Sequence, residues 1–131
     1  MRRMEHSPGF LRAVEAVRPH VAEVDVATMR ESLALGRATV IDVREDGEWA
    51  LGHVPGAVHV GRGVLERDIE RIVPDPATPL VLYCGGGYRS LLAADALRRM
   101  GYTDVASMRG GWREYVVAGG PVVVPSTPDA P

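Results

Sequence analysis

The sequence predicts an α/β fold with a central, mostly parallel five-stranded sheet and helices on both faces. Short runs of β-branched and apolar residues alternate along the chain with segments in which apolar residues recur at helical spacing. One run, Ala38 to Val43, shows no alternation of polar and apolar residues, as expected for a strand that is buried on both faces. Strands that alternate with helices form βαβ units, which place helices on both sides of a parallel sheet.

Length and composition describe one ordinary globular domain. The chain has 131 residues, of which 46% are hydrophobic and 24% charged, which provides enough apolar side chains for a substantial core. The 15 basic and 17 acidic residues give a formal net charge of −2, and no basic block stands out. We therefore expect no nucleic-acid partner.

The sequence also predicts the cellular location of the protein. No apolar stretch approaches the ~18 residues of a membrane span, so we expect no membrane partner. The start of the chain, Met1 to His6, carries early positive charge without an apolar stretch behind it, which argues against a signal peptide. The single cysteine, Cys84, cannot form a disulfide within the chain, which fits a reducing compartment. We therefore expect a cytoplasmic protein.

Residues 1–23 are predicted to form a helical extension that precedes the main domain. Ser7 is suited to cap a helix and Pro8 to occupy its first position. Apolar residues then recur at helical spacing from Phe10 until Pro19 ends the run. This helix either packs on the main domain or mediates self-association, and the sequence leaves the oligomeric state open.

The main domain is predicted to span residues 24–122. Gly36 is expected to stop its first helix, because glycine readily adopts the left-handed conformation that ends helices. The first elements follow in this order: an extended segment at 24–26, a helix capped by Asp25 that runs to about Leu35, a strand at 38–43, a short helix from Arg44 to Leu51, a compact turn from Gly52 to Gly56 and a strand at 57–60.

The second half of the domain continues the alternation. The 90–100 helix is predicted to face the sheet with Ala93, Ala94, Leu97 and Met100, and small residues in this set permit close packing. Residues 123–131 contain three prolines and are expected to fray. The elements in order are a helix at 64–72, a strand from Leu80 to Tyr83, a helix from Ser90 to Met100, a strand from Asp104 to Met108 and a short helix opened by Gly110 and Gly111.

The most informative stretch is the Cys84 loop, residues 84–89, which joins the 80–83 strand to the 90–100 helix. Three glycines and a tyrosine separate Cys84 from Arg89, which gives a C-x4-R pattern. Glycine permits crowded backbone conformations, so successive amides can surround the sulfur. These amides and the helix N-terminus favour a thiolate, and the fork of Arg89 suits an oxyanion. The loop therefore predicts a nucleophilic sulfur, although a lone cysteine is more often a small buried side chain.

Three separated motifs together resemble the rhodanese-like sulfurtransferases, over roughly residues 24–122. Each motif alone is a weak signal, but the three in this order are specific. The first runs from Ile41 to Glu45 and continues with Glu48-Trp49 and Gly52 to Ala57; the second runs from Val81 to Ser90; the third combines Met100 to Tyr102 with Gly110 to Trp112. The resemblance implies a rhodanese-like fold.

In that family a cysteine takes a sulfane sulfur from a donor such as thiosulfate and passes it to cyanide or a thiol. The resemblance implies that Cys84 is the nucleophile and the persulfide carrier. It implies that the Arg89 side chain binds the donor anion or orients the loop, and that the Ser90 hydroxyl donates to the persulfide. The partners it implies are a small sulfur-donor anion and a thiol acceptor, either a small molecule or a protein. The outer sulfur would be held by the amides of Gly85, Gly86, Gly87, Tyr88 and Arg89.

Two alternatives remain open from the sequence. Related phosphatases and arsenate reductases on this fold use a C-x5-R loop, so the shorter loop here favours transfer of a single sulfur atom. A sulfur-relay module, which accepts a persulfide from a partner protein and passes it on, fits the same residues. The loop also carries less positive charge than that of the typical thiosulfate enzymes, which disfavours thiosulfate and leaves the physiological donor open.

Four more residues are predicted to support the loop. Asp42 and Arg44 are expected to form an ion pair that pins the end of their strand beneath the loop, with Glu48 in the same polar network. His53 is expected to stabilise its turn, because attack by a preformed thiolate needs no general base. The other histidines show no metal-ligand spacing and the glycines match no nucleotide-binding pattern, so we expect no metal and no cofactor.

Overall fold

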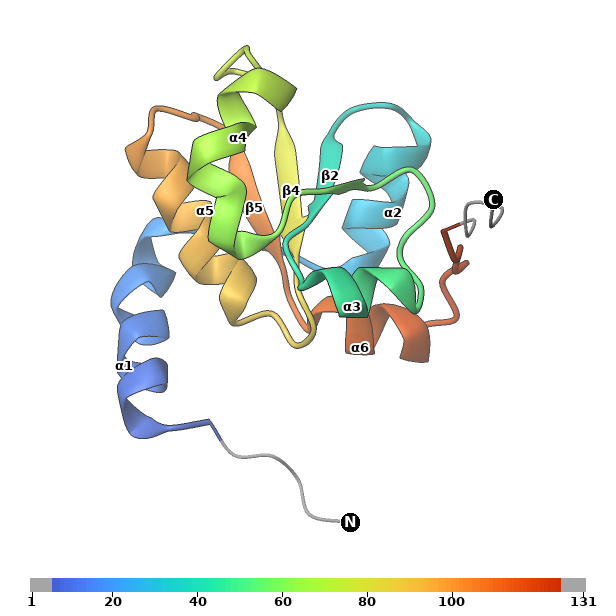
Figure 1. Cartoon of the computed structure of the whole chain (residues 1–131), viewed down its shortest axis with the longest axis horizontal. Helices are drawn as coiled ribbons and strands as arrows, with labels where there is room; N and C mark the ends of the chain where they lie inside the picture. The colour runs from blue at the N-terminus through green and yellow to red at the C-terminus, as the bar shows by residue number, and fades with distance from the viewer. Residues whose placement is uncertain (1–5, 126–131) are drawn as a thin grey trace, which may run out of the picture.

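The computed structural model describes residues 6–125, which form one five-stranded sheet flanked by helices (Figure 1). Every pair of neighbouring strands is parallel, and the strand order is β1-β5-β4-β2-β3. The predicted α/β sheet is therefore confirmed, and it is parallel throughout. The strands are β1 (Ala22–Val24), β2 (Thr39–Asp42), β3 (Val58–His59), β4 (Leu80–Tyr83) and β5 (Val105–Met108).

Helices cover both faces of the sheet, as predicted. On one face α4 and α5 bury Leu65, Ile69 and Leu97 against the sheet, and on the other face α2 and α6 bury Met29 and Tyr115. The helical segments are α1 (Pro8–Val17), η1 (Arg18–His20), α2 (Val26–Ala34), α3 (Asp46–Ala50), η2 (Arg62–Val64), α4 (Leu65–Ile72), α5 (Arg89–Arg99) and α6 (Gly111–Val117), where η denotes a 3₁₀ helix. Among the described residues, no helix has both the length and the apolar character needed to cross a membrane.

Local sequence accounts for the elements that carry the site. All four side chains of β4 are buried, as the unbroken apolar run predicts for a central parallel strand. The Asp25 side chain caps α2 by accepting a hydrogen bond from the Thr28 amide at 2.8 Å. Pro8 occupies the first turn of α1, whereas Ser7 stands at the cap position without a side-chain hydrogen bond. Helix α1 packs against α5 and buries Val14 completely, so the extension packs on the main domain.

Two boundaries differ from the sequence prediction. Strand β1 begins at Ala22, before the expected start of the domain, and Val26 is already helical. The reason is that Ala22 pairs with Ala106 of β5, so the edge strand starts earlier than its apolar residues indicate. Met100 is 36% exposed and does not face the sheet as predicted, because α5 ends at Arg99 and leaves Met100 as the C-cap.

The segment after α6 is held to the domain. Val123 forms an antiparallel bridge with His53, whose amide donates to the Val123 carbonyl at 2.9 Å and whose carbonyl accepts from the Val123 amide at 3.0 Å. The Tyr115 hydroxyl donates to the Pro121 carbonyl at 2.6 Å. Val123 is therefore paired, where the sequence predicted fraying. Residues 126–131 of the predicted tail and 1–5 of the predicted extension lie outside the described residues.

Candidate active site

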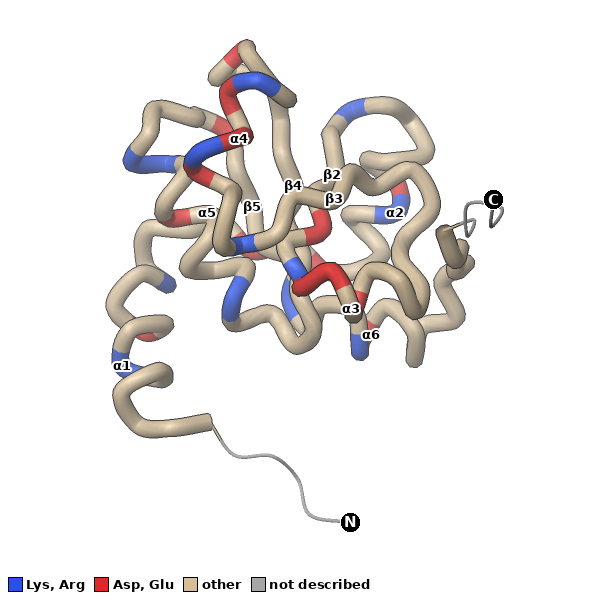
Figure 2. The backbone as a smooth tube through the Cα atoms, in the orientation of Figure 1, with Lys and Arg blue, Asp and Glu red and all other residues tan. Residues whose placement is uncertain are grey.

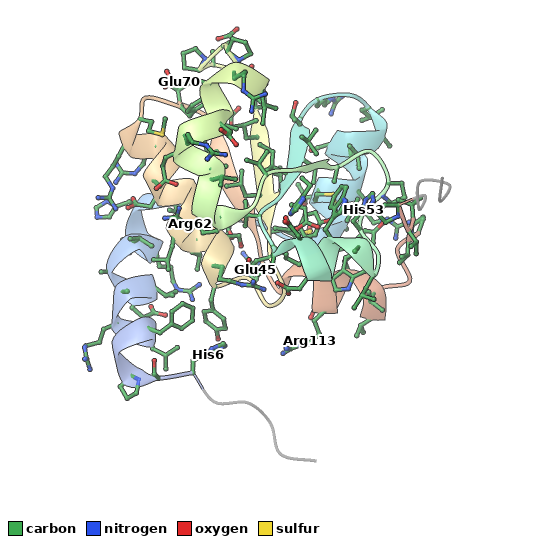
Figure 3. The ribbon with its side chains drawn as sticks, in the orientation of Figure 1. His6, Glu45, His53, Arg62, Glu70 and Arg113 are labelled. Atoms are coloured by element: carbon green, nitrogen blue, oxygen red, sulfur yellow. The ribbon has the colours of Figure 1, made fainter. Side chains whose placement is uncertain are left out.

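The candidate site lies where the carboxyl ends of β2 and β4 meet. Asp42 at the end of β2 pairs in register with Tyr83 at the end of β4, and Cys84 follows directly. This is the lower end of the sheet in Figure 1; in Figure 3 the labelled Glu45 and Arg113 lie near it and Glu70 lies at the opposite end. Parallel α/β sheets place functional groups at this edge. The Cys84 side chain is almost fully buried, at 1% exposure.

The sulfur of Cys84 accepts hydrogen bonds from its own loop and from the first turn of α5. The Gly87 amide donates to Sγ at 3.2 Å and the Ser90 amide, in the first turn of α5, donates at 3.3 Å. The Ser90 hydroxyl lies 3.4 Å from Sγ, within hydrogen-bond reach of sulfur. Amide donors and a helix N-terminus favour negative charge on the sulfur.

Helix α6 fixes the direction of the loop peptides. The Trp112 amide donates to the Cys84 carbonyl at 2.7 Å, and the Arg113 amide donates to the Gly85 carbonyl at 3.0 Å. Both amides belong to the first turn of a helix, where amides lack a partner within the helix. Because α6 binds these two carbonyls, the peptides that carry them are held in one orientation.

Close approach between the loop and α6 requires glycine at two positions. A Cβ atom on Gly111 would lie 2.5 Å from the Cys84 carbonyl oxygen, and the φ angle of Gly111 is +55°. Gly87 has a φ angle of +96°, and a Cβ atom there would lie 3.0 Å from the Gly110 nitrogen. Any other residue at Gly111 would therefore push the loop away from the helix that orients it.

Four further amides of the loop remain available to donate hydrogen bonds to a ligand. Among residues 6–125, no acceptor is bound by the amides of Gly85, Gly86, Tyr88 or Arg89. The family resemblance implied five amides around an outer sulfur; one of them, from Gly87, is bound to Sγ itself, and the other four can bind a further atom. Unpartnered amides in one short loop form an anion-binding concavity.

Arg89 is held by a carboxylate. Its two terminal nitrogens donate to the two oxygens of Glu48 at 2.8 and 3.0 Å, and both side chains are about one-third exposed. The hydrogen bonds from Arg89 lower the pKa of Glu48 below its ordinary value of 4.5. Glu48 Oε1 also accepts from the Glu45 amide at 3.1 Å. Of the two roles implied for Arg89, orienting the loop matches this contact, because the pair ties the loop to α3.

Asp42 and Arg44 form the expected ion pair. Arg44 Nη2 donates to Asp42 Oδ2 at 2.8 Å and Nε donates to both carboxylate oxygens at 3.1 Å, with both side chains buried. Nη2 also donates to the Gly52 carbonyl at 2.7 Å, and the guanidinium carbon lies 4.6 Å from the Trp112 ring centroid. Glu48 was expected in this network, but its hydrogen bonds go to Arg89 and Glu45, since α3 turns its side chain toward the loop.

His53 lies in the turn after α3. Its ring stacks on Trp49 with centroids 3.4 Å apart and planes inclined by 3°, and Nδ1 is 3.1 Å from the Val54 carbonyl. The next amide, of Val54, donates to the Tyr83 hydroxyl at 3.1 Å. Burial raises the pKa of Tyr83, so this hydroxyl stays protonated. These contacts tie the turn to the end of β4.

Two features of the site were not found from the sequence. Ser107 of β5 is fully buried, and its hydroxyl lies 2.7 Å from that of Ser90. The Tyr88 ring packs against His6 and Phe10 at the start of α1, with centroids 4.7 and 6.2 Å apart. A serine inside an apolar strand is a weak signal for the first feature. The second joins residues 78 or more positions apart and leaves no local pattern.

The surroundings of the site carry mixed charge. Figure 2 shows acidic and basic segments interleaved over α3, α4 and α5 of the described chain. Within residues 6–125, no group of three or more His, Cys, Asp or Glu side chains is placed to hold a metal ion. A shallow hollow of about 320 Å³ lies between α3 and η2, and no residue of the Cys84 loop lines it; its lining is Glu45, Asp46, Gly47, Gly61, Gly63 and Val64.

Comparison with known proteins identifies the family. The Rhodanese-like domain family matches residues 25–118. This chain belongs to the rhodanese-like family. The matched range covers the whole Cys84 loop and the first turn of α6, and it begins after α1. The fold and family predicted from the three motifs are thus confirmed.

Individual relatives of this rhodanese-like protein are similar at modest identity. The human thiosulfate:glutathione sulfurtransferase is 32% identical over 108 residues, which cover 71% of this chain and 91% of the human protein. The uncharacterized protein YqhL of Bacillus subtilis is 35% identical over 79 residues, which span 60% of this chain and 61% of that protein. A solved structure from Rhodopseudomonas palustris, described as a possible tyrosine phosphatase, has a TM-score of 0.82 at 26% identity and covers 94% of this chain and 100% of its own.

Proposed function

We propose that this protein is a sulfurtransferase in which Cys84 carries a sulfane sulfur as a persulfide between a donor and a thiol acceptor. One observation carries the proposal: two amides already bind Cys84 Sγ, and four neighbouring amides of the same loop have no acceptor among the described residues. The first group suits a thiolate and the second suits the outer sulfur of a persulfide.

In the first half-reaction, the Cys84 thiolate attacks the sulfane sulfur of the donor. A bond forms between Sγ and that sulfur, and the bond from that sulfur to the rest of the donor breaks. The electron pair of the broken bond leaves with the donor, which is released as sulfite when thiosulfate is used. The outer sulfur then carries the negative charge, and the free amides of Gly85, Gly86, Tyr88 and Arg89 stabilise it.

In the second half-reaction, an acceptor thiolate attacks the outer sulfur of the persulfide. A bond forms between the acceptor and that sulfur, the bond to Sγ breaks, and its electron pair returns to Cys84 as a thiolate. The Gly87 and Ser90 amides stabilise the leaving sulfur as they stabilise the resting thiolate. Two half-reactions through one covalent intermediate give ping-pong kinetics.

The pair of Arg89 and Glu48 bears on the choice of donor. Because Glu48 neutralises Arg89, an anionic donor must compete with a carboxylate for the guanidinium. A sulfane donor with less negative charge than thiosulfate is therefore favoured as the physiological donor. Asp42, Arg44 and His53 are assigned structural roles, because their contacts fix the ends of β2 and β4 beneath the loop.

Two alternatives are weighed against this assignment. Two features disfavour a phosphatase. The loop from Cys84 to Arg89 has only six residues, whereas a phosphatase loop must enclose a phosphate group together with its oxygens. Arg89, in addition, is already bound by Glu48. A sulfur relay uses the same persulfide but takes it from a protein. A sulfurtransferase turns over repeatedly with small donors and small thiols, whereas a sulfur relay does not.

Intact-mass measurement tests the proposal. The protein is incubated with thiosulfate or with glutathione persulfide and then treated with cyanide or glutathione. We expect a gain of one sulfur atom that the acceptor removes and that Cys84→Ser abolishes. Loading without turnover by small thiols would identify a relay, and failure of every sulfane donor together with hydrolysis of a phosphate ester would overturn the proposal.

A further inference from the structure

Two serine hydroxyls lie behind the sulfur of Cys84 in a region that is otherwise apolar. Ser90 on α5 and Ser107 on β5 are both fully buried, and their Oγ atoms are 2.7 Å apart. Ser107 pairs in register with Leu82, whose side chain belongs to the apolar core between the sheet and α5. A hydroxyl buried in such a place must have a hydrogen-bond partner, and the partner of Ser107 is Ser90.

The number of hydrogens on Cys84, Ser90 and Ser107 determines which atom donates in each of the hydrogen bonds between them. Each hydroxyl has one hydrogen to donate and lone pairs to accept. When Cys84 is a thiolate it can only accept, so the Ser90 hydrogen points to Sγ and Ser90 Oγ is free to accept from Ser107. When Cys84 is a thiol, its hydrogen can point to Ser90 Oγ, and Ser90 can then donate to Ser107 Oγ. The direction of donation along the three atoms is thereby reversed.

We propose that Ser107 is a positioning residue for sulfur transfer: by donating to Ser90 Oγ, its hydroxyl directs the Ser90 hydrogen to the Cys84 sulfur whenever that sulfur carries negative charge. Ser107 does not contact the reacting atoms. Its effect passes through Ser90, and a chain of two hydroxyl hydrogen bonds polarises the one that reaches the sulfur.

The two half-reactions depend on this chain in different ways. When the acceptor removes the outer sulfur, Cys84 leaves as a thiolate, and a donor aimed at the leaving sulfur lowers the barrier. When Cys84 attacks, the same donor stabilises the thiolate before the reaction and gives no comparable gain. Loss of Ser107 should therefore slow unloading of the persulfide more than loading, a difference that does not arise from a general packing defect.

The test measures both half-reactions for Ser107→Ala and Ser107→Thr at an alkaline pH of about 10, where even an unperturbed cysteine is ionised. In Ser107→Ala we expect unloading by glutathione to slow about five-fold, the effect of one hydrogen bond, with loading by thiosulfate changed less than two-fold. Ser107→Thr keeps the hydroxyl on a residue suited to a strand and should restore unloading. In Ser90→Ala the further change Ser107→Ala should have no additional effect.

The chain of hydroxyls is tested independently of sulfane chemistry with a mixed disulfide. Cys84 attacks the disulfide cystamine and releases one cysteamine, which leaves Cys84 as a mixed disulfide. Dithiothreitol then attacks the cysteamine sulfur of that mixed disulfide and releases Cys84 as a thiolate. The role of Ser107 in turnover rests on the proposed function, but its effect on a leaving Cys84 thiolate does not. Release of Cys84 from the mixed disulfide should therefore slow by the same factor of about five in Ser107→Ala. Equal release rates in wild type and Ser107→Ala would overturn the proposal, as would equal slowing of loading and unloading. Absence of any sulfur adduct on the wild type, with slowed release from the disulfide, would instead overturn only the sulfurtransferase assignment.

Discussion

Arg44 follows the end of β2 and Arg89 begins α5 after the Cys84 loop. Each forms a two-pronged pair with a carboxylate, but their surroundings differ. Arg44 and Asp42 are 3% and 0% exposed, and Arg44 also binds a backbone carbonyl and lies over aromatic rings. Arg89 and Glu48 are 35% and 38% exposed, at the edge of the Cys84 loop. A buried pair cannot exchange its partner, because an unpaired charge in the interior is costly, whereas a half-exposed pair can open to water or to an anion. The first pair is therefore scaffold, and the second can respond to a substrate.

The largest effect should come from breaking the buried pair. Arg44→Ala leaves the Asp42 carboxylate buried without its cation, which should lower the free energy of unfolding by about 3–5 kcal/mol. Thermal denaturation should show a fall in Tm of about 10 °C or more for a domain of this size.

The matched control replaces both partners by apolar residues. The double variant Asp42→Leu with Arg44→Met should be more stable than Arg44→Ala, because no charge is left unpaired. The exposed pair of Arg62 and Glu66 supplies a second control, and Arg62→Ala should change Tm little. An Arg44→Ala protein as stable as Arg62→Ala would contradict the distinction between the two pairs.

Arg89→Ala should affect chemistry more than stability. Its pair with Glu48 is half-exposed, so Tm should change by only a few degrees. The second-order rate constant for loading by thiosulfate should fall about ten-fold, which corresponds to a lost charged hydrogen bond, and loading by a sulfane donor with less negative charge should fall less. Unchanged thiosulfate loading with a collapsed Tm would show that Arg89 is only structural.

Glu48→Gln should act in the opposite direction on the same measurement. The substitution keeps the shape of the side chain but removes the negative charge that competes for Arg89. Loading by thiosulfate should increase about three-fold, because a screened charge near the surface has a modest effect. Arg89→Ala with Glu48→Gln should lose this gain, since the gain acts through the guanidinium.

The smallest effect is the pH dependence of stability that Glu48 contributes. Its pKa in the folded protein is lowered below the ordinary 4.5, first through the Arg89 hydrogen bonds. Such a group stabilises the fold above the unfolded pKa, and the contribution is lost as the pH falls through the folded pKa. The Tm advantage of the wild type over Glu48→Gln should thus be constant near neutral pH and vanish in acid. An advantage that persists in strong acid would contradict it.

The sequence predicted the parts of the site that lie within contiguous stretches, and it missed several contacts that join distant stretches. β4 and the Cys84 loop are one uninterrupted stretch, so the strand, the thiol and the turn could be read together. The pair of Glu48 and Arg89 joins residues 41 positions apart, and only the fold shows which carboxylate the arginine meets. The helical spacing of apolar residues predicted that Met100 faces the sheet. Met100 lies one residue past the end of α5, where helical spacing no longer determines burial. The sequence places Ser107 in a strand but does not show that its side chain lies on the same side of the sheet as Ser90 and Cys84.

The two hydrogen bonds from α6 to the Cys84 loop have a consequence for how the protein is made. Trp112 and Arg113 orient the loop peptides, and they follow Cys84 by 28 and 29 positions. During synthesis the thiol leaves the ribosome before the residues that complete its surroundings, because chains emerge from the N-terminus. A chain that stops before residue 111 contains the cysteine and every strand of the sheet but not the two amides that bind the loop carbonyls. We therefore predict that the Cys84 loop acquires its full set of contacts only after the C-terminal helix has docked.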